Sequence, residues 1–213
     1  MIFHRSDCLL YAVTDRSFTG KKTLEQMVRE ALASGVTMLQ LREKDLDERR
    51  FLEEALLMRK LTKYYGVPLI INDNVEIALR CQADGVHVGQ DDINAAEARL
   101  AIGPERILGV TAKTVEQAKL AEAQGADYLG SGAVFGSQTK KEALPMTLDT
   151  LSAICKNVSI PVAAIGGITA SNVTKLSGTG IAGAAVVSGI FGQCDISLAV
   201  RTLKDKLIEV VNP

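Results

Sequence analysis

The stretch EALASGVTMLQL, residues 30–41, joins a helical pattern to a strand pattern. An alanine-rich segment is followed by Gly35 and then by a short run of mostly apolar residues. The same order returns in three further segments, IALRCQADGVHVGQ, LAEAQGADYLGSGAV and TKLSGTGIAGAAVVSG, at residues 77–90, 120–134 and 174–189. Such self-similarity indicates a structural unit, a helix followed by a strand, that is repeated along the chain.

Further strands and helices are predicted between these copies. Apolar runs predict strands at Cys8–Thr14, Pro68–Asp73, Arg106–Thr111 and Pro161–Gly167. Apolar residues three and four apart predict helices at Leu24–Ser34, Glu48–Tyr65, Val115–Ala123, Leu148–Lys156 and Ile196–Val211, with weaker ones at Val75–Cys81, Ala95–Ala101 and Ala170–Leu176. Strands without long polar faces suit a parallel sheet covered by helices. Eight strand and helix units of about 26 residues predict an α/β protein, a single-domain (β/α)8 TIM barrel over residues 1–213, because an open doubly wound sheet usually has fewer strands.

The composition excludes several classes of protein. With 47% hydrophobic and 23% charged residues, the chain resembles an ordinary globular protein. A formal net charge of -1 gives no general attraction to nucleic acid or to an anionic membrane. No apolar run approaches the roughly 20 residues that span a bilayer. We therefore expect no nucleic-acid or membrane partner and a cytoplasmic location, with four widely spaced cysteines that stay reduced.

A barrel of this kind builds its active site from the loops after the carboxyl ends of its strands. Polar or glycine residues follow every predicted strand after the first, in chain order: Gln40, Arg42 and Lys44; Asn72 and Asp73; Gln90, Asp91 and Asp92; Thr111 and Lys113; residues 131–141; Gly166 and Gly167; Ser188 and Gly189. The loops therefore predict a polar site at one end of the barrel.

Asp73 and Asp92 follow neighbouring predicted strands and allow two interpretations. Two hard oxygen ligands beside a cationic cluster suit Mg²⁺ shared with a substrate phosphate. Alternatively, each carboxylate caps the helix that follows, with Asn74 beginning the helix after Asp73. Capping alone is the less favoured interpretation, because both acids are expected opposite a patch of Arg and Lys.

The cations and glycines predict binding sites for anions. Arg42 presents a planar fork to phosphate oxygens, and Lys44 and Lys140 present point charges, although Lys44 could instead lie on a solvated rim. The segment GSGAVFGSQTKK, residues 130–141, combines glycines with hydroxyl and amide donors, and its alternative is a flexible surface loop. AIGGIT and VVSGIF end the last two strands, where many barrels hold a phosphate. The metal and lysine residues thus form one anion site, and the glycine-rich segments form a second in the same pocket. A substrate with a single phosphate needs only the second site, so the first implies a pyrophosphate, released as a leaving group.

Seven motifs carry a resemblance to one family. In this order and spacing, QLREK, IND, GVHVGQDD, LGVTAKT, SQTKK, AIGGIT and VVSGI resemble the thiamine phosphate synthases, and the likeness runs from Leu10 to the final helix. The resemblance implies a transferase that joins 4-amino-2-methyl-5-(diphosphooxymethyl)pyrimidine to a carboxylated thiazole phosphate. Pyrophosphate, CO₂ and thiamine phosphate would be released. It also implies one Mg²⁺ per subunit and small phosphorylated substrates as partners, and it is compatible with a homo-oligomer.

The resemblance also implies roles for individual residues. The pyrimidine diphosphate would be bound by Gln40, Leu41, Arg42, Glu43, Lys44, Asn72, Thr111 and Lys140. The thiazole phosphate would be bound by Ser137, Gln138, Thr139, Gly167, Val187 and Ser188, and Mg²⁺ by Asp73 and Asp92. Arg42, Lys44, Lys140 and Thr111 would be catalytic. The C–O bond to diphosphate would break first, so the chemistry needs electrostatic stabilisation and no general base. We accordingly interpret His87 as structural.

The sequence departs from the family pattern at three places. Thr111 stands where the family often has Ser, Lys113 where it often has His, and the loop with Ser137 lacks the usual Pro and has Ser where Thr is usual. Two alternatives share the expected fold. One is a thiazole tautomerase-type relative, and the other is a non-catalytic sensor of thiamine intermediates. The tautomerase relatives tend to lack the metal carboxylates and the Gln-Arg-Lys trio, which are present here.

Overall fold

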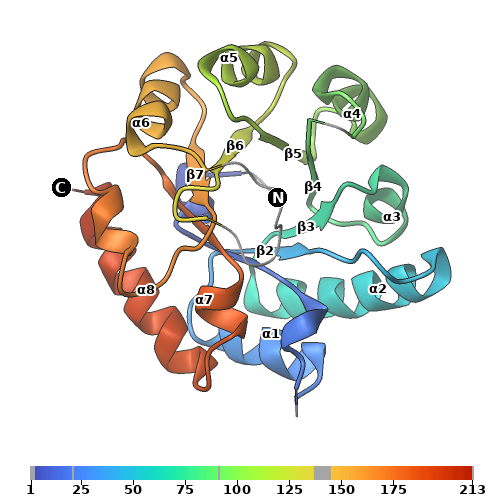
Figure 1. The fold of residues 1–213 in the computed structure, drawn as a ribbon. Coiled ribbons are helices and arrows are strands. Elements are labelled where there is room, and N and C mark those ends of the chain that lie inside the picture. The colour runs from blue at the N-terminus through green and yellow to red at the C-terminus, as the bar shows by residue number, and fades with distance from the viewer. Residues whose placement is uncertain (1–2, 21, 91, 137–144, 213) are drawn as a thin grey trace.

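The computed structural model describes residues 3–20, 22–90, 92–136 and 145–212. Within these ranges, parallel strands close into a barrel in the order β1 to β8, and β8 pairs with β1. Figure 1 shows this ring of strands at the centre and the helices around it. The strands are β1 Leu10–Val13, β2 Met38–Leu41, β3 Leu69–Asn72, β4 Gly85–Val88, β5 Ile107–Thr111, β6 Tyr128–Gly132, β7 Val162–Ile165 and β8 Gly183–Val186.

Helices connect successive strands. The α-helices are α1 Leu24–Ala33, α2 Glu48–Tyr65, α3 Val75–Arg80, α4 Ala95–Ile102, α5 Val115–Ala123, α6 Leu148–Asn157, α7 Ser188–Phe191 and α8 Ile196–Val211. Most begin at a side chain that accepts a hydrogen bond from the backbone two or three residues on, as Thr23 does for α1 and Asp47 for α2. Such caps satisfy amides that the first turn leaves unpaired. Short 3₁₀ helices are η1 Arg5–Cys8, η2 Arg16–Phe18 and η3 Val173–Leu176.

Alternation along the strands separates two apolar cores. Leu39 and Leu41 of β2 pack in the outer core between strands and helices. Met38, on the opposite face of β2, packs with Tyr11 and Tyr128 in the interior of the barrel. Leu39 and Leu41 therefore face the helices. Polar residues that continue the inner face of β2 therefore reach the open end of the barrel.

The predicted α/β class and single-domain (β/α)8 TIM barrel are confirmed. The assignment of all residues 1–213 to one catalytic domain stays a prediction. Among the described helices, none has the length and apolar character needed to cross a bilayer. Two local predictions were wrong. The helix expected at Ala170–Leu176 is reduced to η3, because Thr169 and Asn172 form a turn in which the Asn172 side chain binds the Thr169 amide. The first strand begins at Leu10, because residues up to Cys8 form η1.

Candidate active site

A cavity of about 380 Å³ opens at the carboxyl ends of the strands. Its described wall receives residues from all eight strands or the loops that follow them. Most predicted site residues that the structure describes line it: Gln40, Arg42, Lys44, Asn72, Asp73, Asp92, Thr111, Gly167, Val187 and Ser188. Ser137, Gln138, Thr139 and Lys140 lie outside the described residues, so their predicted roles stay predictions.

Asp73 is held at the cavity by an ion pair and by an unusual backbone conformation. Its Oδ2 lies 2.5 Å from Lys44 Nζ. Its φ of 60° is in the left-handed region, and its amide donates to the carbonyl of His87 over 2.8 Å. Such a conformation costs about 1 to 3 kcal/mol in a residue other than glycine and tends to occur at functional sites. The cap of α3 is Asn74, whose Oδ1 accepts from the Ile77 amide. The capping interpretation of Asp73 is therefore wrong.

Asp92 lies close to Asp73 and also leaves the capping role to a neighbour. Its Oδ2 accepts from the Gly89 amide over 2.8 Å, and Asn94 caps α4. Partial burial, together with the neighbouring Asp73 carboxyl, raises the pKa of Asp92. Two carboxyl groups that disfavour each other's charge form a pair that a cation would stabilise.

The donor set fits Mg²⁺ shared with a substrate. Among the described residues, no group of three or more His, Cys, Asp or Glu side chains could hold a metal. Asp73 and Asp92 together offer two carboxylates at the cavity. Mg²⁺ usually binds in proteins through one or two carboxylates, with phosphate oxygens and waters completing its shell. The two residues present match that pattern.

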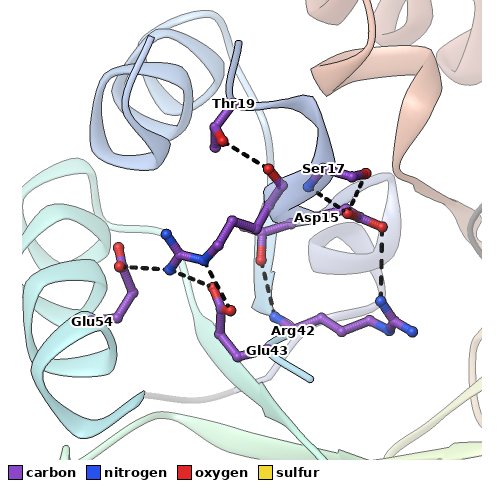
Figure 2. A network of polar contacts seen from close by, with 8 residues as sticks. Asp15, Ser17, Thr19, Arg42, Glu43 and Glu54 are labelled. Carbon is purple, nitrogen blue, oxygen red and sulfur yellow. Dashed lines mark hydrogen bonds and ion pairs between the residues drawn. The ribbon is translucent and has the colours of Figure 1, made fainter. Parts of the chain in front are cut away.

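Arg42 is positioned by the loop after β1. Its guanidinium lies 3.8 Å from Asp15 Oδ2, and its amide donates to Thr14 Oγ1 over 3.0 Å. Asp15 is held in turn by the amide and hydroxyl of Ser17, as Figure 2 shows. Asp15, which follows β1, was not among the predicted site residues. The signal was Asp15, which directly follows the first predicted strand, but its partner Arg42 follows β2, and only the folded barrel brings the two together.

Arg16 links two elements beside this wall. Its guanidinium binds both oxygens of Glu43, over 3.2 and 2.9 Å, and lies 2.9 Å from Glu54 of α2. Glu43 and Glu54 are labelled in Figure 2. The Glu43 side chain is only 3% exposed and is not among those lining the cavity. The Leu41 side chain lies in the outer core. Any substrate contact made by Leu41 or Glu43 therefore involves the backbone, and their predicted roles stay predictions.

A buried set of hydrogen bonds forms the floor of the cavity. Gln40 Nε2 donates to the Tyr11 hydroxyl over 2.6 Å, and the hydroxyls of Tyr11 and Tyr128 lie 2.7 Å apart. His87 lies 3.1 Å from the Tyr128 hydroxyl through Nδ1 and 3.0 Å from Thr111 Oγ1 through Nε2. Burial lowers the pKa of His87 to about 4, so its ring is neutral at pH 7. His87 thus lies in the cavity wall, which its interpretation as structural did not foresee.

The opposite wall is shaped by glycines. Gly166 and Gly167 have φ values of 105° and 61°. A Cβ on Gly167 would lie 2.5 Å from the carbonyl oxygen of Phe135, so only glycine fits this approach. Val187 and Ser188 line the same side, at the start of α7. This arrangement can offer backbone amides and a hydroxyl to an anion.

Known proteins resemble this chain over nearly its full length. The family model described as "Thiamine monophosphate synthase" matches residues 10–190. A thiamine-phosphate synthase of Ruminiclostridium cellulolyticum is 48% identical, over 96% of this chain and 95% of the relative. A "Thiamine-phosphate synthase 2" of Streptococcus pneumoniae is 43% identical, over 98% of this chain and all of the relative. The solved thiamine phosphate pyrophosphorylase of Pyrococcus furiosus superposes with a TM-score of 0.89 at 37% identity, covering 97% of this chain and 98% of that one. Because the likeness extends over both the barrel and the loops at its mouth, the chain belongs to the thiamine monophosphate synthase family.

Proposed function

We propose that the chain is a thiamine phosphate synthase. It joins 4-amino-2-methyl-5-(diphosphooxymethyl)pyrimidine to a thiazole phosphate and releases pyrophosphate. One observation carries the proposal: Arg42 and Lys44 line the same cavity as the acidic pair Asp73 and Asp92. A diphosphate needs cations around it, and a carboxylate pair beside it suits a shared metal. A site for a monophosphate alone would need neither carboxylate.

The two substrates are assigned to the two sides of the cavity. The pyrimidine diphosphate lies against Gln40, Leu41, Arg42, Glu43, Lys44, Asn72, Thr111 and Lys140. The thiazole phosphate lies against Ser137, Gln138, Thr139, Gly167, Val187 and Ser188. This division is supported by the cations found on the first side and by the glycine backbone found on the second.

The reaction separates charge at the diphosphate. The bond between the pyrimidine methylene carbon and the diphosphate oxygen breaks, and its electron pair leaves with the diphosphate. The lone pair of the thiazole nitrogen then forms a new bond to that carbon. Where the thiazole carries a carboxylate, the C–C bond to that group then breaks, CO₂ leaves, and the electron pair left on the ring carbon takes up a proton from water. Arg42, Lys44 and Lys140 stabilise the negative charge that grows on the leaving diphosphate. Stabilising this charge is the main catalytic demand of such a step.

Lys44 can take this role because its ion pair with Asp73 is weak. Its side chain is 50% exposed in the ion pair with Asp73. Exposed pairs contribute only about 0 to 1 kcal/mol, so Lys44 can turn to the diphosphate at little cost. Asp73 and Asp92 would hold one Mg²⁺ per subunit. When bound, this ion supplies further positive charge to the leaving group.

We further infer a cytoplasmic location, where thiols stay reduced. The four cysteines are free in the structure, including the exposed Cys194.

The test is a product assay on the purified full chain. Carboxylated and plain thiazole phosphates are compared as substrates, each with the pyrimidine diphosphate and with or without Mg²⁺. We expect thiamine phosphate only when Mg²⁺ is present. The absence of product with either thiazole, while the thiazole phosphate still binds, would overturn the proposal in favour of a tautomerase-type relative or a sensor.

A further inference from the structure

Five side chains form an unbroken hydrogen-bonded chain through the interior of the barrel. It runs from Gln40 through Tyr11, Tyr128 and His87 to Thr111. Tyr11 and Tyr128 are 1% and 0% exposed, and their rings pack edge to face at 5.7 Å. The two ends of the chain, Gln40 and Thr111, line the cavity. Buried tyrosines are thus connected to the part of the site assigned above to the pyrimidine.

The number of available protons limits the chain to two patterns. Each tyrosine carries one hydroxyl proton, and a neutral histidine carries one ring proton. With the Gln40 amide nitrogen donating, as it lies in the structure, Tyr11 donates to Tyr128 and Tyr128 donates to His87 Nδ1. The histidine proton is then on Nε2 and is donated to Thr111. In the opposite pattern, the Gln40 amide is turned so that its oxygen accepts from Tyr11, and each of the other hydrogen bonds runs in the reverse direction.

Mixed patterns are excluded by burial. They would leave two protons facing one another, or two lone pairs, at the hydroxyls of tyrosines that are only 1% and 0% exposed. Within the described residues, no other hydrogen-bond partner is recorded for either tyrosine hydroxyl. Unpaired buried polar groups are costly, so the members of such a network change together or not at all.

We propose that Tyr11, Tyr128 and His87 are positioning residues that fix the hydrogen-bond polarity of the cavity, with Gln40 offering an acceptor and Thr111 a donor. The outward atom of Gln40 is then its carbonyl oxygen, and the Thr111 proton points to the ligand. This inference rests on the proposed function, because an aminopyrimidine supplies the complementary pair. Its amino group donates, and its ring nitrogens accept.

The first test observes the histidine directly and requires no activity. The chain has two histidines, so His4→Gln, at an exposed position, leaves His87 as the only one. In ¹⁵N-labelled protein at pH 7, we expect ring shifts of a single tautomer with the proton on Nε2. In Tyr128→Phe, which removes the donor to Nδ1, we expect a mixture of tautomers. A wild-type ring protonated on Nδ1, or a mixture of tautomers there, would overturn the proposed polarity.

The second test asks whether the polarity reaches the ligand. We expect Tyr11→Phe to raise KM for the pyrimidine diphosphate about tenfold, which is 1.4 kcal/mol, with kcat and the KM of the thiazole phosphate within about twofold. The matched control is Tyr64→Phe, at a hydroxyl-bearing ring that is 81% exposed. A merely structural role would lower the thermal midpoint while leaving both KM values equal to those of wild type, and that result would refute the proposal.

A probe of reversed polarity separates this inference from the proposed function. The 4-oxo analogue of the pyrimidine diphosphate presents an acceptor and a ring N–H where the substrate presents a donor and an acceptor. Measured by calorimetry, wild type should bind the analogue at least about tenfold more weakly than the amino compound, and Tyr11→Phe should lose most of that preference. If wild type and Tyr11→Phe prefer the amino compound equally, the proposed hydrogen-bond polarity is refuted. If wild type does not turn over the substrates, only the proposed function is refuted.

Discussion

Over β2 to β5, the mouth of the barrel is lined by charged side chains, whereas over β6 to β8 the described residues that line it are uncharged. On the first side, the cationic side chains form ion pairs with carboxylates, as in Lys44–Asp73 and Arg42–Asp15. On the second side, the conformation is set by backbone, with Gly166 and Gly167 at positive φ. Activity should therefore be sensitive to changes of side-chain charge on the first side and to changes of side-chain volume on the second.

The difference has a physical basis. A diphosphate that leaves with growing charge must be met by charges that are already in place, since their preorganisation is what lowers the barrier. A phosphate that stays unchanged through the reaction needs only a cradle. Glycine amides can provide one without bringing a charge that would compete for the leaving group.

The largest effect is expected on the charged side, from Asp92→Asn. The amide oxygen can still accept from Gly89, so folding should be retained. Loss of one carboxylate from the metal pair should lower turnover about a thousandfold, the upper part of the range for removal of one electrostatic group. The control is Asp205→Asn, at an exposed position of α8. Turnover equal to that of wild type would remove Asp92 from the site.

Arg42→Ala should come next, with turnover reduced about a hundredfold. The side chain is 24% exposed and pairs with Asp15 only over 3.8 Å, so its loss should cost little folding stability. Arg29→Ala, which breaks an exposed ion pair on α1, serves as the control. If Arg42→Ala lowers the unfolding free energy and turnover falls only in proportion to the unfolded fraction, the assignment fails.

On the uncharged side, Gly167→Ala should raise KM for the thiazole phosphate about tenfold while leaving that for the pyrimidine diphosphate unchanged. The added Cβ would meet the Phe135 carbonyl at 2.5 Å and displace the cradle. Gly178→Ala is the matched control, because its φ of 78° carries the same backbone cost with nothing within 4 Å. Equal KM changes in the two variants would show that backbone strain, and not the fit to the ligand, is responsible.

The smallest effect is expected from Arg16→Met, which breaks the link from Arg16 to Glu43 and Glu54 but removes no contact to a side chain that lines the cavity. A partly exposed pair contributes about 0.2 to 1 kcal/mol, so we expect KM for the pyrimidine diphosphate to rise by about fivefold at most. Arg49→Met removes a more exposed pair of similar geometry within α2 and should leave KM unaltered. A change in the KM of the thiazole phosphate of equal size would contradict a local role for Arg16.

The sequence predicts the bounds of helices better than it predicts which side chains contact one another. The bounds of α2, Glu48–Tyr65, and of α5, Val115–Ala123, were predicted without error because cap residues and apolar spacing are local properties. The shared location of Arg42, Lys44, Asp73 and Asp92 was also predictable, since every strand of a parallel barrel ends on the same side. Asp15 and Arg16 were missed because their partners follow a different strand.

The sequence alone determined the repeated helix and strand units, the barrel class and the family, because each depends on the order of residues along the chain. Only the tertiary structure decided which residues at the ends of those units cap helices and which contact one another. It made caps of Asn74 and Asn94, so that Asp73 and Asp92 cap neither helix. It also joined Tyr11 to Tyr128, which are 117 positions apart. Such contacts depend on closure of the ring and on strand register, and no local pattern encodes them.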